Sequence, residues 1–352
     1  MKITHARRAT ANGIGIETAH GLPTRNARFY LLDHEVTLPF VDRRSLTSAQ
    51  MEAIRSLQKL DTRRNWKILT LGLFWLIGAS ISLYFDVLIV QLLGVVLSGM
   101  SINGLSVLMH DACHGLLSKN KRLNRMLGIL TGIPALVSFS AYRSIHLLHH
   151  SHARTELDPD DIHRTAPKSV SQILVYYVVL LAGIYIYLGT VAVVGYQKAK
   201  KDQKRKILQE YALLVGVIAL AVVFAPWKAV LLVRLLPLLV AGQLANIRGL
   251  AEHGMTTPNN PFADTRTVIS NGFVRFFMSN LNFHIEHHLY PGVPWYNLDR
   301  LHTIVKGEEY HAASSVYPGY TRFLADFVKA TSRGYIPDAS LVPAHIRDEF
   351  TH

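Results

Sequence analysis

The apolar segment VLIVQLLGVVLSGMSINGLSVLM at residues 87–109 runs directly into HDACH at residues 110–114. Such a segment is long enough to cross the hydrocarbon core of a bilayer, for which about 20 residues suffice. His110 and His114 are four residues apart, so both imidazoles project from the same face of a helix. The junction predicts a membrane helix that ends in a pair of candidate metal ligands, although such a pair alone is equally typical of a helix end.

Two further histidine clusters stand beside apolar segments, HLLHH at residues 146–150 and HIEHH at residues 284–288, and His253 lies alone between them. In each cluster the spacing places three imidazoles on one helical face. Nine imidazoles are too many for one zinc ion and suit two ions of higher coordination number. Because imidazole suits ferrous iron, we predict two iron ions that react with O2. The predicted ligands are His110, His114, His146, His149, His150, His253, His284, His287 and His288.

Because the imidazole ligands would be neutral, the metal charge must be balanced by bound hydroxide or by outer carboxylates that accept the free ring N–H groups. The candidates for this outer role are Asp111, Glu156, Asp158, Asp160, Asp161 and Glu252. The run DPDD at residues 158–161 is also typical of a turn that ends a helix. Glu286 lies two positions from His284 and points off the ligand face, so we expect it to be solvated or salt-bridged. We expect outer-shell or solvated positions for His152 and His163.

The composition indicates a membrane protein. Of the 352 residues 49% are hydrophobic and only 17% are charged, and the mean hydropathy is +0.19. The net charge of +13 indicates contact with anionic lipid headgroups, since the basic run Lys198–Lys206 lacks the interleaved aromatic residues of nucleic-acid binders. Cys113, the one cysteine, cannot form an internal disulfide and is expected to be a small buried hydrophobe. No cleaved signal peptide is evident at residues 1–18.

We predict an all-α integral membrane fold with four transmembrane helices in two hairpins, plus interfacial or re-entrant helices and a cytoplasmic cap that carries the histidines. The predicted hairpins are Trp66–Phe85 with Val87–Met109, and Tyr211–Ala225 with Ala229–Ile247, the second turning at Pro226. Leu127–Phe139 is too short to span. If Val170–Tyr196 and both later runs all crossed, His253 would be separated from the first two clusters, so one run does not cross or the last two form one helix broken at Pro226. We predict that Val170–Tyr196 dips in and returns. Arg234 is an intramembrane charge for which the sequence gives no reason.

The distribution of basic residues predicts which side of the membrane the histidines face. The basic run at Lys198–Lys206 is expected on the cytoplasmic side, and both outer turns carry little positive charge. We therefore predict three segments: a cytoplasmic N-terminal segment at residues 1–65, a membrane domain at residues 66–302 and a cytoplasmic C-terminal segment at residues 303–352. An amphipathic patch around Met51, Ile54, Leu57 and Leu60 is expected to lie on the bilayer or on the core.

As a set, these motifs resemble the integral-membrane fatty acid desaturase superfamily, whose members carry HxxxH, HxxHH and a third HxxHH box. NFHIEHHLYP at residues 282–291 with Pro294-Trp295, and RGLAEHG at residues 248–254, look like acyl-lipid desaturases, and the likeness spans about residues 66–302. The resemblance implies two irons at the cytoplasmic face, held by the same nine histidines. The chain also resembles carotenoid ketolases and hydroxylases of this superfamily, in HDA at residues 110–112 with Gly115 and in DPD at residues 158–160.

Two departures from these relatives matter. The third box begins with His284, where front-end desaturases have Gln, and no HPGG heme motif is present. Electrons must therefore come from a separate donor of the ferredoxin or cytochrome b5 type with its reductase. Stearoyl-CoA desaturases have Asn four residues before the isolated histidine, whereas this chain has Gly249, so a different ligand or an open site is expected there.

The resulting prediction is an oxygen-dependent fatty acyl desaturase of the acyl-lipid type. The alternative is a diiron hydroxylase or ketolase that acts on a carotenoid or another lipid, because oxygen rebound and second hydrogen abstraction compete at such a centre. A non-catalytic metal carrier or bis-histidine cytochrome is a third class. It is disfavoured because the histidines cluster at helix exits rather than inside the spans.

Overall fold

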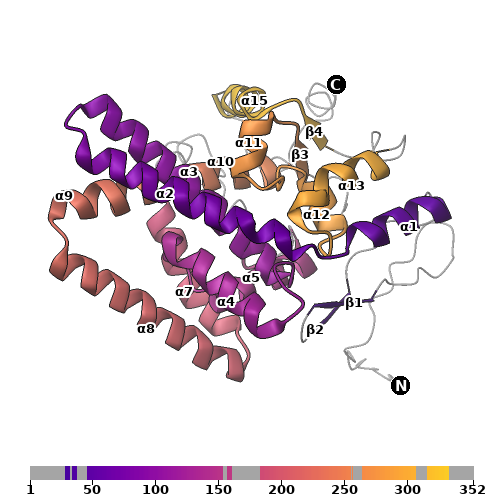
Figure 1. Ribbon diagram of the computed structural model, residues 1–352. Helices are drawn as coiled ribbons and strands as arrows, with labels where there is room; N and C mark the ends of the chain where they lie inside the picture. The colour runs from indigo at the N-terminus through magenta and orange to yellow at the C-terminus, as the bar shows by residue number, and fades with distance from the viewer. Residues whose placement is uncertain are drawn as a thin grey trace, which may run out of the picture.

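A computed structural model of the chain describes residues 28–31, 34–37, 46–153, 157–160, 183–254, 256, 264–306 and 315–332. Within these residues the fold is almost entirely helical, and its strands form two small two-stranded sheets. The predicted all-α class is therefore confirmed. In Figure 1 the long helices extend to the left, and the short helices and strands gather at the right.

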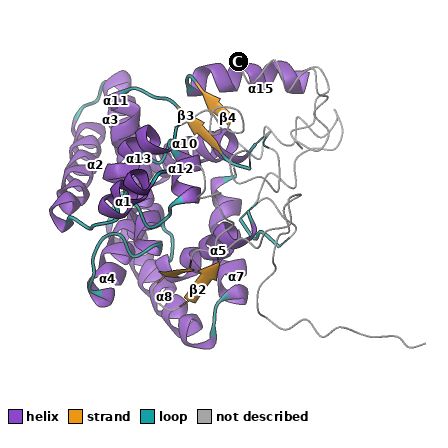
Figure 2. Cartoon of the chain, turned by 90° about the vertical axis from the view of Figure 1, so that its right-hand side faces the viewer, coloured by secondary structure: helices purple, strands orange, loops and turns teal. Residues whose placement is uncertain are grey.

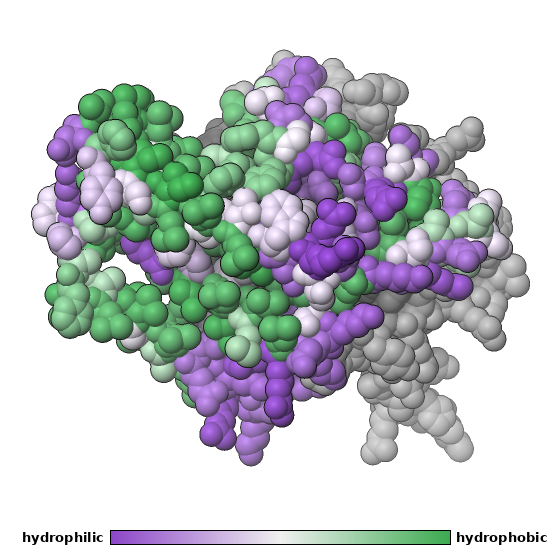
Figure 3. Space-filling view, in the orientation of Figure 1, coloured by the Kyte–Doolittle hydropathy of each residue, from purple (hydrophilic) through white to green (hydrophobic). Residues whose placement is uncertain are grey.

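Four helices in the described residues are long and apolar enough to cross a membrane. They are α2 (Trp66–Tyr84) with the preceding η2 (Thr62–Asn65), α3 (Leu88–Cys113), α8 (Lys201–Phe224), and the continuous α9 (Trp227–Ala229), η5 (Val230–Leu235) and α10 (Leu236–His253). They follow one another as two pairs, as the apolar pattern predicts. Hydrophobic side chains cover the long-helix end of the surface, and hydrophilic ones gather over the start of α8 and at the short-helix end (Figure 3).

The spans differ from the predicted ones mainly at their ends. Helix α8 begins ten residues before the predicted Tyr211, so the basic run Lys201–Lys206 forms its first turns and is not a link between helices. Helix α10 continues beyond the predicted end at Ile247 and carries His253 in its last turn. Charged residues lower hydropathy without opposing helix formation, so apolar length underestimates a helix that projects from the bilayer.

The first hairpin is held by contact between backbones. A Cβ atom at Gly78 would lie 2.5 Å from Ser98 Oγ, and one at Gly94 would lie 2.5 Å from the carbonyl oxygen of Gly78. Across the hairpin, Ser82 of α2 donates a hydrogen bond to the Gln91 carbonyl oxygen of α3 at 3.1 Å. Small residues at facing positions permit this close approach, which is the usual way that helices associate in a bilayer.

A bent helix pair leads from the first hairpin to the second histidine cluster. Helix α4 (Lys121–Gly132) and η3 (Ile133–Ala135) meet α5 (Phe139–His152) at an angle of 99°. Asn120 caps α4 and Ser138 caps α5 by accepting backbone N–H groups with their side chains. Helix α4 begins just after α3 ends, and α5 brings the chain back to the histidines, so the bend is that of a broken span or of a re-entrant loop. The interfacial or re-entrant form of Leu127–Phe139 stays a prediction, after which we call this pair the re-entrant segment.

The remaining elements surround the histidine-bearing end. They are β1 (Arg28–Leu31) and β2 (His34–Thr37), α1 (Ser48–Leu57), α7 (Ile184–Lys198), β3 (Arg266–Val268), α11 (Gly272–Phe277), α12 (His284–Leu289), η6 (Trp295–Asn297), α13 (Leu298–Val305), β4 (Ser315–Tyr317) and α15 (Tyr320–Ser332). Strands β3 and β4 pair in parallel and lie between α15 and the histidine-bearing helices α10 and α12 (Figure 2). Ile54 and Leu57 of α1 pack on the core formed with α13, so the amphipathic patch lies on the protein.

Two sequence predictions fall partly outside the described residues. Helix α7 forms the second half of the predicted Val170–Tyr196 segment, whose residues 170–182 lie outside them. Glu156, Asp161 and His163 are also outside. Cys113 is fully buried in the main core cluster, as expected.

Candidate metal centre

Four helices deliver the nine predicted ligands to one place. Helix α3 carries His110 in its last turn and is followed directly by His114 at its C-cap, and α10 ends at His253. Helices α5 and α12 carry the two triplets. Seven of the nine side chains are buried, and His253 and His288 are half-buried. Local helical spacing aligns the rings within each cluster, and packing of the four helices brings the clusters together.

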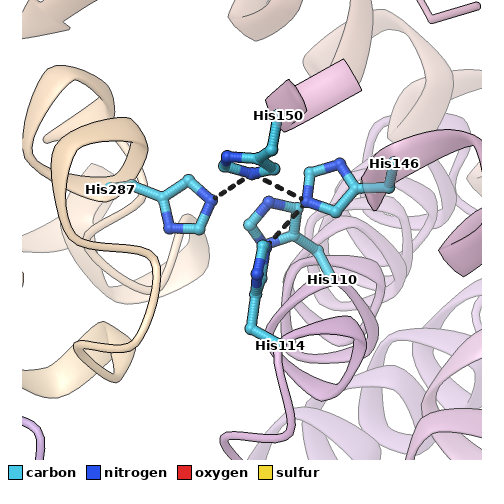
Figure 4. A group of neighbouring side chains, drawn as sticks. All are labelled: His110, His114, His146, His150 and His287. Atoms are coloured by element: carbon cyan, nitrogen blue, oxygen red, sulfur yellow. Dashed lines mark hydrogen bonds between the residues drawn. The ribbon is translucent and has the colours of Figure 1, made fainter. Parts of the chain in front are cut away.

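Five of the rings form one group, His110, His114, His146, His150 and His287, each offering one nitrogen within 4.8 Å of all the others. Figure 4 shows these five rings turned toward a common centre from separate parts of the chain. His146 Nε2 lies 2.8 Å from His114 Nε2 and 3.1 Å from His150 Nε2. His287 Nε2 lies 3.1 Å from His150 Nε2. Converging imidazole nitrogens at this spacing fit a shared cation.

The other four histidines form a second group beside the first. Single nitrogens of His149, His253 and His288 lie within 4.8 Å of one another, and so do ligand atoms of Glu252, His253 and His284. His284 Nε2 is 2.9 Å from His253 Nε2 and 3.1 Å from His288 Nε2. The rings of His150 and His288 stack with centroids 4.3 Å apart and so join the two groups. Two groups of ligands fit two ions better than one.

Burial keeps these imidazoles neutral, which is the state that binds a metal. Loss of hydration lowers the pKa of His114 to about 3 and holds the pKa of His146, His150 and His287 well below 6.5. Most of the outer Nδ1 atoms are buried without a hydrogen-bond partner, including those of His114, His150 and His287. The donor set of the five-histidine group is therefore all nitrogen and uncharged.

Three of the predicted outer carboxylates lie against the rings. Asp158 Oδ2 accepts from His149 Nδ1 at 2.8 Å, which fixes the tautomer that leaves Nε2 free for a metal. Asp111 Oδ1 is 3.6 Å from His110 Nδ1, and Glu252 Oε2 is 3.6 Å from His284 Nδ1. These two distances are too long for hydrogen bonds but place each carboxylate beside a candidate ligand.

The other predicted outer groups have different partners. Asp160 accepts a hydrogen bond from the Tyr187 hydroxyl at 3.1 Å instead of from a histidine. The Nδ1 atom of His152 donates to the Leu148 carbonyl oxygen of its own helix at 3.2 Å, away from the two groups.

Sequence reasoning missed a buried pair behind the third cluster. Of the two roles expected for Glu286, solvated or salt-bridged, the structure shows the second, with a partner that was not predicted. The side chain is fully buried, and its Oε1 atom lies 2.6 Å from His302 Nδ1. Its other oxygen accepts from the Thr267 hydroxyl at 2.6 Å. The available signal was the amphipathic pattern of α13, where Leu298 and Leu301 face the core and bring His302 to its edge.

A cavity of about 150 Å³ opens beside both histidine groups. Its lining near the histidines includes Tyr142, Asn246 and Gly249. Away from them the lining is apolar and comes from α3, the re-entrant segment, α7 and α10. An apolar cavity that ends at convergent ligands suits a small or elongated lipid-soluble substrate.

Known proteins with similar sequences give a consistent picture. The chain is 25% identical to a fatty acid desaturase from Bacillus subtilis (strain 168), over 66% of this chain and 72% of the relative. It is 26% identical to an sn-1 acyl-lipid omega-3 desaturase (ferredoxin) from Nostoc sp. (strain 36), covering 59% and 66%. It is 28% identical to a beta-carotene ketolase from Paracoccus sp. (strain PC1), covering 67% and 86%. The family model for fatty acid desaturases matches residues 86–319, and the chain belongs to the fatty acid desaturase family.

Proposed function

We propose that this chain is an oxygen-dependent fatty acyl desaturase of the acyl-lipid type, with two irons held by the nine histidines. The observation that carries the proposal is the meeting of nine imidazoles, in two groups, beside an apolar cavity inside a helical bundle of membrane length. Ferrous ions bound there would supply the O2 chemistry that breaks unactivated C–H bonds. Removing two hydrogens with O2, two electrons and two protons leaves an alkene and two waters.

The protein's own residues present the ligand atoms, orient the histidine rings and exclude water. The buried imidazoles stay neutral and present their nitrogens without competing protonation. Asp158 holds the His149 ring in one orientation, and Asp111 accepts the Trp295 backbone N–H at 3.1 Å, which ties the first cluster to the loop after the third. The cavity fixes which methylene approaches the histidines and keeps bulk water from the reacting carbon.

The electrons are proposed to come from a separate ferredoxin or cytochrome b5. The name of the Nostoc relative includes ferredoxin, which supports a donor of that kind. We further propose that the histidine groups face the cytoplasm. The support is the basic start of α8, which lies at the same end of the bundle as the histidine-bearing helices (Figure 1).

Expression in a host whose lipids lack the product tests the proposed activity. Fatty acid analysis should reveal a new unsaturated species with the wild type and none with a His287→Ala variant produced at the same level. Metal analysis of the purified wild type should find close to two irons per polypeptide. An unchanged lipid profile from membranes that contain iron-loaded protein would contradict the proposal.

A diiron ketolase or hydroxylase remains the second candidate, favoured by the similarity to the Paracoccus ketolase. The two outcomes differ in product mass, because desaturation removes two hydrogens whereas hydroxylation adds an oxygen. Feeding β-carotene and saturated acyl lipids to the same membranes, followed by mass spectrometry of both pools, separates the two activities.

A further inference from the structure

Arg234, the intramembrane charge that the sequence leaves without a reason, holds the tip of the re-entrant segment. Its Nη2 and Nη1 atoms donate to the carbonyl oxygens of Ile133 and Pro134, both at 3.1 Å. The guanidinium also lies 5.9 Å from the centre of the Trp75 ring. Carbonyl groups at a helix end have no partner in the helix, and hydrocarbon offers none. The Ile133 carbonyl oxygen also accepts the Leu136 N–H at 3.0 Å, so Arg234 adds a second donor there and gives the Pro134 carbonyl oxygen a donor that the bilayer does not offer.

The helix around Arg234 is distorted at that position. Val230–Leu235 forms a π-helical turn between α9 and α10. Such turns are rare and are often found at functional sites. Arg234 is half-buried against the re-entrant tip, while the adjacent Leu235 remains exposed at the bundle surface.

The position of Trp75 indicates that this contact lies inside the apolar layer. Trp75 is at the middle of α2, and the Arg234 guanidinium lies 5.9 Å from its ring. Arg234 itself is about 10 Å along its own span from Trp227, at about 1.5 Å per residue, whereas the hydrocarbon layer is about 30 Å thick. A charge at this depth is costly unless it has a specific partner, and functional roles are common there.

The residues next to this contact form the end of the cavity that is remote from the histidines. Ala135 and Val137 follow the two bonded carbonyls, and Leu238 lies one helical turn after Arg234. All three line the cavity and are buried, together with Ile102 of α3 and Ile184 of α7. We call these five residues the apolar end. Arg234 thus joins two of its walls, the re-entrant tip and α10.

We propose that Arg234 is a positioning residue that fixes the apolar end and so limits the length of chain accepted beyond the carbon presented to the histidines. The proposal rests on the proposed acyl desaturase function. A rigid end excludes methylenes that do not fit, because overpacking a close-packed site is unfavourable. Each further methylene that does find room is worth about a fourfold gain in binding.

A purely structural role for Arg234 leads to a different expectation. If its hydrogen bonds only stabilise the bundle, their loss lowers the amount of folded enzyme and affects substrates of every length equally. The ratio of kcat/KM values for a long and a short acyl substrate is therefore the informative measurement, because it does not depend on the amount of active protein.

The experiment compares acyl substrates of increasing length, in competition, with full-length enzyme in membranes. Arg234→Met keeps the bulk of the side chain and removes its donors, so the long-to-short ratio should rise by about fourfold for each methylene admitted. Arg234→Lys, which keeps a donor, should restore part of the selectivity. Lys228→Met is the matched control, because Lys228 pairs with Asp86 at the exposed outer turns and does not touch the apolar end.

Two variants test the same end without removing the arginine. Val137→Ala should shift the preference to longer chains, and Ala135→Leu should shift it to shorter ones. Equilibrium binding of fluorescent fatty acids of different lengths to the iron-free protein should follow the same order. An unchanged length preference in Arg234→Met and Val137→Ala would overturn the role of Arg234, whereas wild-type protein that binds no acyl chain would overturn the proposed function instead.

Discussion

The two membrane hairpins have similar apolar composition and very different surroundings. The most apolar window of α3 has a mean hydropathy of 1.8 and is 67% buried, whereas that of α8 has 2.2 and is only 17% buried. Helix α3 has small residues where it meets α2, and α8 exposes residues such as Val222, Val223 and Phe224. Hydropathy therefore identifies a span, and the placement of small residues identifies which span is packed in protein.

This difference assigns separate tasks to the hairpins. The first is the frame, because α3 carries two candidate ligands and supplies much of the main core cluster. The second closes the site from the other side and supplies His253. Its helix α10 packs closely on α3, where a Cβ atom at Gly99 would lie 2.5 Å from Val240 Cβ, and Glu210 of α8 and Lys228 at the outer turn add polar contacts.

The largest effect is expected from breaking the close contact of the first hairpin. Gly94→Leu forces a side chain into the backbone of α2, and we expect a loss of about 3 kcal/mol or more in stability, with little folded protein recovered. Gly216→Leu in α8 is the matched control, because a Cβ atom there meets nothing within 4 Å. Thermal unfolding in detergent compares them, and equal destabilisation would contradict the assignment of the first hairpin as the frame.

Replacing one ligand from each hairpin should separate the two histidine groups. His110→Ala leaves four imidazoles in its group, and His253→Ala leaves three in the other. We expect activity to fall by roughly 100-fold or more in both, because outer-shell changes alone cost 10 to 100-fold. Bound iron should fall further in His253→Ala. Metal analysis checks this, with His152→Ala as the control, and equal iron loss in the two variants would argue against two distinct groups.

Glu210 is the buried anchor of the second hairpin. Its carboxylate accepts from Arg125 at 2.6 Å, from the Ser138 hydroxyl at 2.7 Å, and from the Ser140 backbone N–H and hydroxyl, both at 2.8 Å. Glu210→Ala leaves these donors without their partner, and we expect a loss of about 3 kcal/mol or somewhat less. The melting temperature in detergent measures it. A shift no larger than that of the outer-turn variant below would show that the anchor is unimportant.

The smallest effect is expected at the outer turns, where the hairpins are joined by an exposed ion pair. Lys228 Nζ lies 3.2 Å from Asp86 Oδ1, and both side chains are at least half exposed. Lys228→Met should change stability by about 0–1 kcal/mol, and less at high salt. Thermal unfolding at low and high ionic strength checks this, and a larger loss of stability would mean that contacts other than this ion pair also join the outer turns.

Local patterns predicted the helices and the histidine groups, because spacing along one helix fixes which rings share a face. The apolar runs predicted the spans for the same reason, since length and hydropathy are properties of a single segment. The Glu286–His302 pair and the Arg234 contact were not predicted. In each case the two partners lie in different elements that meet only through tertiary packing. No sequence spacing within either element therefore indicates the contact. The parallel strands β3 and β4 escaped notice because three residues give no periodicity.

The parallel strands β3 and β4 also bear on the order in which the protein is assembled. Arg266 at the start of β3 donates to the carbonyl oxygens of Ala251 and Gly254, on either side of His253, and β3 is completed by β4 near residue 315. That second strand is among the later parts of the chain to leave the ribosome, long after both hairpins can enter the bilayer. The end of α10 therefore gains this support only after both hairpins have been made, and a chain terminated before β4 would leave its histidine-bearing helices incompletely supported.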